Sequence, residues 1–478
     1  MKEAKKINKV RLFLENIMIY GLGGVISKLV PIIMLPIITY LLPDTSFFGL
    51  SDLSITVTSF ASAFALLGMY DAMYRLFFEK EEERFKKQVC STAFCFTIIS
   101  SIVITIILLI GKNIIAELVF KDRKYVYLVY IAAAATLVSA TNSIVAAPTR
   151  MQNKRKIYLI ANTIAPILSY SIAIPLILKG YYIIALPLAS LVSAATIEIS
   201  FYFINCKWFS FKLFDKKVLK QLFIIGVPLL PNFLIYWIFN SSDKLMITSI
   251  IDVGASGVYG VGAKLGHISQ LIYTAFAGGW QFFAFSTMKE KNQVESNSKV
   301  FEYLGIISFV TSVFVFAFSK LFFIIVFPEE YYEGFVVAPY LFLAPLMQML
   351  FQVIANQFLV IKKTWPNMII LFSGAIINVV LNLTLIPRIG IEGAAIATLI
   401  GYVCSDVICS IVLCKMKLMV VTSKFCISAL FMLIYIILWR LLFIESTLMG
   451  IFGALAFLVV AVVLYKEDLL KFFKMIKK

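Results

Sequence analysis

Long apolar segments recur along almost the whole chain, separated by short polar connections. A bilayer core of about 30 Å is crossed by about 20 apolar residues in a helix, and fourteen segments reach that length. The mean hydropathy of +0.95, with 14% charged residues, leaves little material for a soluble domain. The sequence therefore predicts an all-α membrane protein with about 14 transmembrane helices, at residues 12–42, 47–70, 88–111, 125–148, 157–178, 181–206, 219–241, 254–285, 298–327, 335–361, 366–387, 391–414, 424–444 and 446–465.

Lysine and arginine residues are concentrated in alternate connections between these segments. Cytoplasmic loops retain basic residues during membrane insertion, so the side rich in them is expected to be cytoplasmic. The 112–124 connection is an exception, because it is basic although it falls on the outer side. Both termini are predicted to be cytoplasmic, together with the basic residues in 2–11, 75–87, 150–156, 207–220, 289–299, 362–363, 415–424 and 466–478.

The net charge of +17 follows from this topology. We interpret it as attraction to anionic lipid of the inner leaflet, because a nucleic-acid partner needs one contiguous basic face outside the membrane. With one histidine in the chain, the seven cysteines are interpreted as apolar filler rather than as metal ligands. No large loop carries clustered acids, so we expect no catalytic residues, no cofactor and no metal.

The two halves of the chain are similar at an offset of about 210 residues. Residues 180–189 resemble residues 390–399, and residues 47–49 resemble residues 258–260. Six spans per half is an even number, so both halves enter from the same side and a parallel repeat is predicted. Two such lobes would enclose a central cavity and favour alternating access. The predicted domains are an N-lobe at 1–210, a C-lobe at 211–415 and an accessory helix pair with a basic tail at 416–478.

Lys28 lies about halfway along the first span, where a charge is costly without a partner or water. We expect it to line the cavity. The alternative is a structural lysine bonded to backbone carbonyls that Pro31 and Pro36 leave free.

A polar stripe runs along the eighth span. Lys264 and His267 are one helical turn apart, and Gln270, Thr274 and Gln281 continue the same face. A stripe with two basic groups is expected to line a cavity and bind substrate. A seam of small and polar residues between helices is the alternative, and His267 fits both interpretations equally.

Five further charged residues lie in or near the spans. Asp71 and Arg75 are four residues apart and can form a helix-surface ion pair or part of a gate. Asp52 is nearly equivalent in the repeat to Lys264, and facing lobes would bring the two together. Glu198 and Asp406, in spans six and twelve, are candidates for coupling to a proton or cation, with polar packing as the alternative.

Several short motifs in order give the chain a family resemblance. It resembles a polysaccharide-biosynthesis flippase of the multidrug/oligosaccharidyl-lipid/polysaccharide exporter superfamily. The residues that carry the resemblance are 24–29 (GVISKL), 48–50 (FGL), 242–247 (SDKLMI), 257–265 (GVYGVGAKL) and 390–395 (GIEGAA).

The resemblance implies translocation of an undecaprenyl-diphosphate-linked oligosaccharide across the bacterial inner membrane, for O-antigen, capsule or exopolysaccharide. It implies the membrane lipids, the lipid-linked oligosaccharide and the glycosyltransferases and polymerase of the same pathway as partners. Lys28 and Lys264 would supply cations to the diphosphate in a cationic cavity.

Two alternatives come from the same superfamily. A multidrug or cation antiporter usually carries a buried acid in its first span, whereas residues 16–43 hold no acid, only Lys28. A lipid II flippase shares fourteen spans and a cationic cavity, and the sequence separates it only weakly from the first interpretation.

Overall fold

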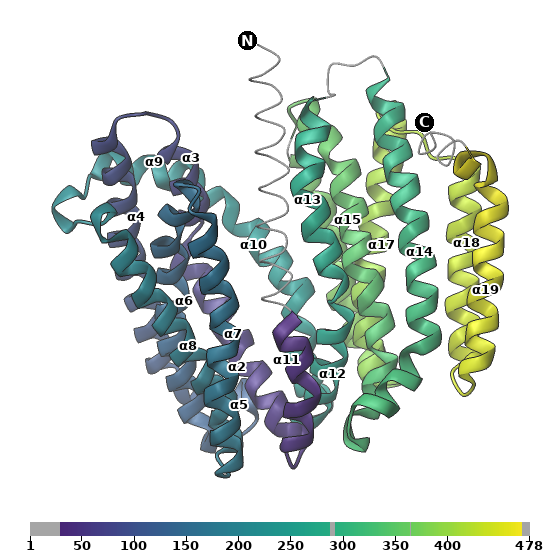
Figure 1. The fold of residues 1–478 in the computed structure, drawn as a ribbon, viewed down its shortest axis with the longest axis horizontal. Coiled ribbons are helices and arrows are strands. Elements are labelled where there is room, and N and C mark those ends of the chain that lie inside the picture. Colours follow the sequence, from purple (N-terminus) through teal and green to yellow (C-terminus); the bar gives the residue numbers. More distant parts are fainter. Residues whose placement is uncertain (1–28, 287–291, 364, 471–478) are drawn as a thin grey trace. The chain divides into compact units, whose positions relative to one another are not determined.

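The protein is described here by a computed structural model that covers residues 29–286, 292–363 and 365–470. Every regular element in these ranges is a helix, and none is a strand (Figure 1). The predicted all-α fold is therefore confirmed.

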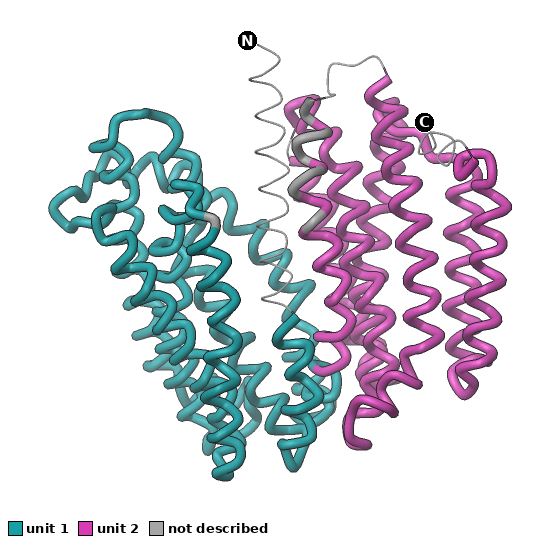
Figure 2. Tube along the Cα trace, viewed as in Figure 1, with its two compact units in different colours: residues 1–260 teal, residues 261–478 magenta. Residues whose placement is uncertain are grey.

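The chain forms two compact units, unit 1 at residues 1–260 and unit 2 at residues 261–478 (Figure 2). Unit 1 contains the helical segment Leu29–Leu41 and the helices α2 (Thr45–Leu66), α3 (Met69–Phe77), α4 (Glu83–Ile110), α5 (Lys112–Phe120), α6 (Val126–Met151), α7 (Arg155–Leu178), α8 (Tyr182–Asn205), α9 (Lys216–Gly226), α10 (Leu230–Trp237) and α11 (Asp243–Ile250). Helix α12 (Val253–Gly266) begins in unit 1 and ends in unit 2.

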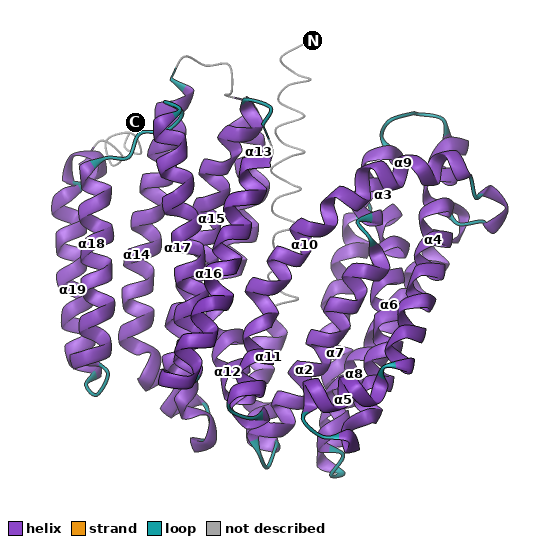
Figure 3. Ribbon diagram, turned by 180° about the vertical axis from the view of Figure 1, so that it is seen from behind, coloured by secondary structure: helices purple, strands orange, loops and turns teal. Residues whose placement is uncertain are grey.

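Seven α-helices follow in the described residues of unit 2, and all are coloured as helix in Figure 3. They are α13 (Ser269–Ser286), α14 (Gln293–Val326), α15 (Ala338–Val360), α16 (Trp365–Ile389), α17 (Ile391–Lys415), α18 (Ser423–Leu438) and α19 (Thr447–Leu464).

Polar side chains cap the starts of several helices. Asp44 Oδ1 accepts from Ser46 N at 2.7 Å before α2, and Asp215 Oδ1 accepts from Lys217 N at 2.7 Å before α9. Thr422 caps α18 in the same way. These caps satisfy backbone donors that a helix start leaves free, which fixes where the apolar spans begin.

In the described part of the chain, twelve helices are long and apolar enough to cross a membrane, and they match twelve of the predicted spans. Of the first predicted span, 12–42, the structure describes only the apolar helix Leu29–Leu41. Large apolar side chains remain exposed on these helices, among them Ile110, Phe203 and Leu441. In a protein that spans a bilayer, such side chains face lipid.

The eighth predicted span is not one helix, and this prediction was wrong. Helix α12 ends at Gly266 and α13 begins at Ser269. Between them, His267 N donates to Ala263 O at 2.8 Å, and Ile268 N donates to Leu265 O at 3.1 Å. The second bond spans three residues instead of four, so α12 ends in a 3₁₀-type turn. Helix α12 also contains several glycines, which weaken a helix.

The two halves repeat one packing scheme. In unit 1, α6 packs on α2, α4 and α8, and α7 packs on α8. In unit 2, α15 packs on α13, α14 and α17, and α16 packs on α17. These are the pairs expected if each helix corresponds to the one six spans later, so the packing supports the predicted repeat.

The predicted seventh span, α9 to α11, packs on helices of unit 1. Helix α9 contacts α3 and α4, α10 contacts α2, and α11 contacts α5. The boundary between the compact units thus lies after residue 260, and the lobe boundaries at residues 210 and 415 stay a prediction.

The last two helices are held to unit 2 by buried acids. Both α18 and α19 pack on α14 (Figures 1 and 3). Glu302 on α14 accepts from Tyr465 at 2.7 Å and from Thr422 at 2.5 Å. Near the other end of α18, Glu392 accepts from Tyr340 at 3.0 Å and lies 2.8 Å from Arg440 Nε.

Candidate functional site

A π-helical turn interrupts the seventh span just before two charged residues. Residues Ile238–Ser242 form this turn, and α11 begins directly after it with Asp243 and Lys244. A π-helical turn is rare and is frequently found at functional sites, since it changes the direction in which side chains point. The segment 242–247 is also one of the motifs named above.

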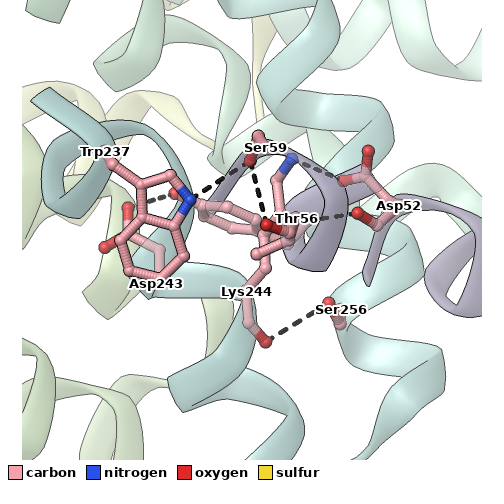
Figure 4. A network of polar contacts seen from close by, with 8 residues as sticks. Asp52, Thr56, Ser59, Trp237, Asp243, Lys244 and Ser256 are labelled. Atoms are coloured by element: carbon pink, nitrogen blue, oxygen red, sulfur yellow. Dashed lines mark hydrogen bonds and ion pairs between the residues drawn. The ribbon is translucent and has the colours of Figure 1, made fainter. Parts of the chain in front are cut away.

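Lys244 forms a buried ion pair with Asp52 of α2 (Figure 4). Lys244 Nζ lies 2.7 Å from Asp52 Oδ2, and the two side chains are only 16% and 3% exposed. A charge this deep is costly unless it is paired. The pair therefore ties α11 to α2 at a depth where neither charge is stable alone.

Further hydrogen bonds surround this pair (Figure 4). Asp243 Oδ2 accepts from Tyr259 of α12 at 2.6 Å, so the two acids at this site contact different helices. Trp237 Nε1 donates to Ser59 Oγ at 3.1 Å. The network joins α2, the end of α10, α11 and the middle of α12.

The first turns of α2 and α12 approach each other closely at two glycines. A Cβ on Gly49 would lie 2.2 Å from Val253 O, and a Cβ on Gly257 would lie 2.1 Å from Thr45 O. Neither contact is sterically allowed for a larger residue. Glycine at both positions is therefore required for this crossing.

The predicted polar stripe of the eighth span lies at the break between α12 and α13. Lys264 is half-buried in the last turn of α12, His267 is half-buried in the break, and Gln270 is half-buried in α13. The Thr274 hydroxyl bonds to the Gln270 carbonyl. The stripe thus changes direction at His267, whereas the sequence predicted one continuous helical face.

Two predicted substrate-binding residues cannot be placed. Lys28 lies outside the described residues, and so does the side chain of Gln281.

Asp71 and Arg75 do not pair with each other. Both are exposed on α3, and the ion pairs of the described residues include none between them. Although the residue as a whole is exposed, partial desolvation of its carboxyl raises the pKa of Asp71, and a backbone hydrogen bond and the charge of Arg150 partly oppose this. Arg150 donates to Tyr70 Oη at 2.6 Å and lies over the ring of Tyr158, 5.2 Å from its centroid, so its position is fixed by aromatic residues.

The two candidate coupling acids have different surroundings. Glu198 on α8 is half-buried and lies near Thr141. Asp406 on α17 is 7% exposed, and neither of its carboxylate oxygens has a hydrogen-bond partner among the described residues. In the same part of the chain, no group of three or more His, Cys, Asp or Glu residues is placed to hold a metal ion.

Lys244 was not predicted as a site residue, because the predicted seventh span ended at residue 241, before it. In the structure, Asp52 is seven residues from the start of α2 and Lys244 is six residues from the end of α11, so each lies about 10 Å along its helix from that end at 1.5 Å per residue. The sequence signal that could have drawn attention to Lys244 is its place in the motif 242–247.

A family model described as "Polysaccharide biosynthesis protein" matches residues 41–336. The fold is similar to that of the lipid II flippase MurJ in an inward closed conformation, with a TM-score of 0.74 and 17% identity over 95% of this chain and 100% of that one.

Two multidrug transporters of the MATE family also share the fold. An inward-facing transporter of the MOP superfamily has a TM-score of 0.58 and 15% identity over 82% of this chain and 98% of that one. The transporter DinF-BH has a TM-score of 0.59 and 17% identity over 85% of this chain and 95% of that one. No curated protein sequence matches the chain significantly.

Proposed function

The chain belongs to the family of polysaccharide biosynthesis proteins, and from this membership we propose that it is a flippase for an undecaprenyl-diphosphate-linked oligosaccharide. One observation carries the proposal: a chain of this family has the helix arrangement of solved flippases and transporters. The protein is a multi-pass membrane protein. We place it in the bacterial inner membrane with both termini in the cytoplasm, where the glycosyltransferases of its pathway would supply the substrate.

The charges of the eighth span support an anionic cargo. Lys264 is half-buried next to a helix break and is followed by His267 and Gln270. Cations and amide donors are the groups that bind phosphate oxygens. The attraction between a diphosphate bound there and these groups would be screened less than in water. Lys28 would add a second cation. Alternating access of the two lobes would then move the head group while the polyprenyl tail stays in lipid.

Replacing Lys264 with alanine is expected to reduce export of the lipid-linked glycan severely, because the diphosphate loses a cation. Lys264→Arg should retain more activity than Lys264→Gln, since it keeps the charge. Export is measured as surface glycan in cells, with Lys179→Ala, an exposed lysine, as the matched control. Normal export by Lys264→Gln, at normal protein level, would contradict a role in binding charge.

Transport in reconstituted vesicles is expected to respond to an imposed membrane potential. The diphosphate carries at least two negative charges, and a potential negative inside favours outward movement of each by about 2.3 kcal/mol per 100 mV. The measurement compares rates of head-group translocation at imposed, zero and reversed potential, with and without ATP. Equal rates at all three potentials, together with a rate increase on adding ATP, would refute this energy source.

A second candidate function is lipid II translocation, which the similarity to MurJ favours. Lipid II carries the same diphosphate-linked polyprenyl group, so the proposed site fits both cargoes. Expression in cells depleted of their own lipid II flippase separates them: rescue of growth supports lipid II, and loss of surface polysaccharide on deletion supports the oligosaccharide.

A further inference from the structure

Unit 2 contains an apolar groove between α17 and α18. Its volume is about 1090 Å³, and its walls come from α14, α15, α17 and α18. Helix α18 packs against α14 and α19, and the groove separates it from α17. Almost all lining residues are apolar, for example Met347, Val403 and Leu433.

The groove opens toward the surroundings of the protein. Val407 and Ile411 of α17 and Leu433 of α18 line it, and each is at least half exposed. These helices are among the membrane spans, so the medium that these side chains contact is lipid. Hydrocarbon chains of the surrounding bilayer are therefore the occupant that fits the groove.

One wall of this groove carries a carboxyl group. Asp406 lines the groove together with Ser410, one turn further along α17. Its side chain is more than nine-tenths buried, and both oxygens are without a hydrogen-bond partner in the described ranges. An ionised carboxylate in such surroundings would be uncompensated, and a buried group in that position takes up a proton instead.

No charged side chain facing the groove is close to Asp406 along the chain. Lys415 is nine residues away on α17, about 13 Å along the axis at 1.5 Å per residue. Helix α14 contributes phenylalanines, and its Glu302 bonds to Tyr465 and Thr422. The remaining titratable groups that line the groove are Tyr340 on α15, Cys414 on α17, Cys426 on α18 and Arg440 after α18, and Cys409 is the neighbour on the same helix.

We propose that Asp406 is a proton-binding site reached from the hydrocarbon of the bilayer, and that lipid chains fill the groove only while the proton is bound. Release of the proton leaves a negative charge in the wall. That charge draws water or a cation into the groove, so the contact between α17 and the lipid beside α18 changes with protonation. The inference concerns unit 2 alone and does not depend on which cargo the protein moves.

Dicyclohexylcarbodiimide tests the site, because it partitions into hydrocarbon and reacts with protonated carboxyls. The acid O–H adds across one C=N bond, and the acyl group then shifts to nitrogen with no leaving group. The full chain in phospholipid vesicles is expected to be labelled at Asp406, as read by peptide mass spectrometry. Labelling should be faster at acidic than at alkaline pH, and a water-soluble carbodiimide should label it much less.

Two variants provide controls. Asp406→Asn should lose the label on this peptide, whereas Glu198→Gln, which changes a half-buried acid on α8, should keep it. Asp406→Asn should also remove a pH dependence of thermal unfolding, because the amide resembles the neutral acid: the wild type should lose stability relative to the variant as the pH rises. Absence of label on wild-type Asp406 at acidic pH, or labelling only by the water-soluble reagent, would overturn the proposal.

Discussion

Lys244→Met should lower the free energy of unfolding by about 3–5 kcal/mol, the cost of leaving a buried charge without its partner. Asp52 would remain only 3% exposed and lose the ammonium group that lies 2.7 Å away. The change is measured as the thermal midpoint and denaturant sensitivity of the purified protein in detergent. A large decrease would identify Lys244 as an interior residue, although it lies beyond the end of the predicted seventh span.

The double variant Asp52→Asn with Lys244→Met is the informative control. It removes both charges, so it should be more stable than either single variant, even if it stays below the wild type. Lys179→Met, at an exposed lysine in the same unit, should change the midpoint little. Equal midpoints for Lys179→Met and Lys244→Met would show that the ion pair contributes nothing.

Gly257→Ala is expected to be the second severe substitution. The added Cβ would lie 2.1 Å from the backbone oxygen of Thr45, and backbone cannot rotate away as a side chain can. The first turns of α2 and α12 must then separate, at a cost of about 1–3 kcal/mol or more. We expect a lower thermal midpoint and strongly reduced export, because the same movement displaces Tyr259 from Asp243.

Gly111→Ala is the matched comparison. Its Cβ would meet nothing closer than 3.4 Å, which is ordinary van der Waals contact. It should leave both stability and export near the wild-type values. If Gly111→Ala and Gly257→Ala behave alike, the crossing of α2 and α12 is not a constraint on the fold.

The spans were predictable because apolar length alone determines them. Residues 366–387 and 391–414 were predicted as spans, and the helices are Trp365–Ile389 and Ile391–Lys415. The turn between them is marked by Gly390, which has a positive φ of 64°. The break at His267 was not predicted, because Lys264, His267 and Gln270 recur at helical spacing and were interpreted as one continuous helical face, whereas α12 ends at Gly266 and α13 begins at Ser269.

The ion-pair partners of the charged residues were harder to predict than the positions of these residues along the spans. Asp52 was recognised as a buried acid, but its ion pair with Lys244 depends on α11 packing in unit 1. The i, i+4 spacing of Asp71 and Arg75 permitted a pair, and the structure places Arg150 of another helix near Asp71 instead. Sequence spacing describes one helix, whereas a buried charge is compensated by whichever helix packs beside it.

The buried acids beneath α18 and α19 restrict how a shorter protein of this fold can be built. Glu302 accepts hydrogen bonds from Thr422 and Tyr465, and Glu392 forms an ion pair with Arg440. These three partners belong to the 63 residues at 416–478, which were predicted as an accessory helix pair with a basic tail. A truncation before residue 416 would therefore leave two carboxyl groups facing lipid. Any relative that lacks the pair should carry neutral residues at both positions, and gain or loss of the two helices in evolution should require those substitutions first.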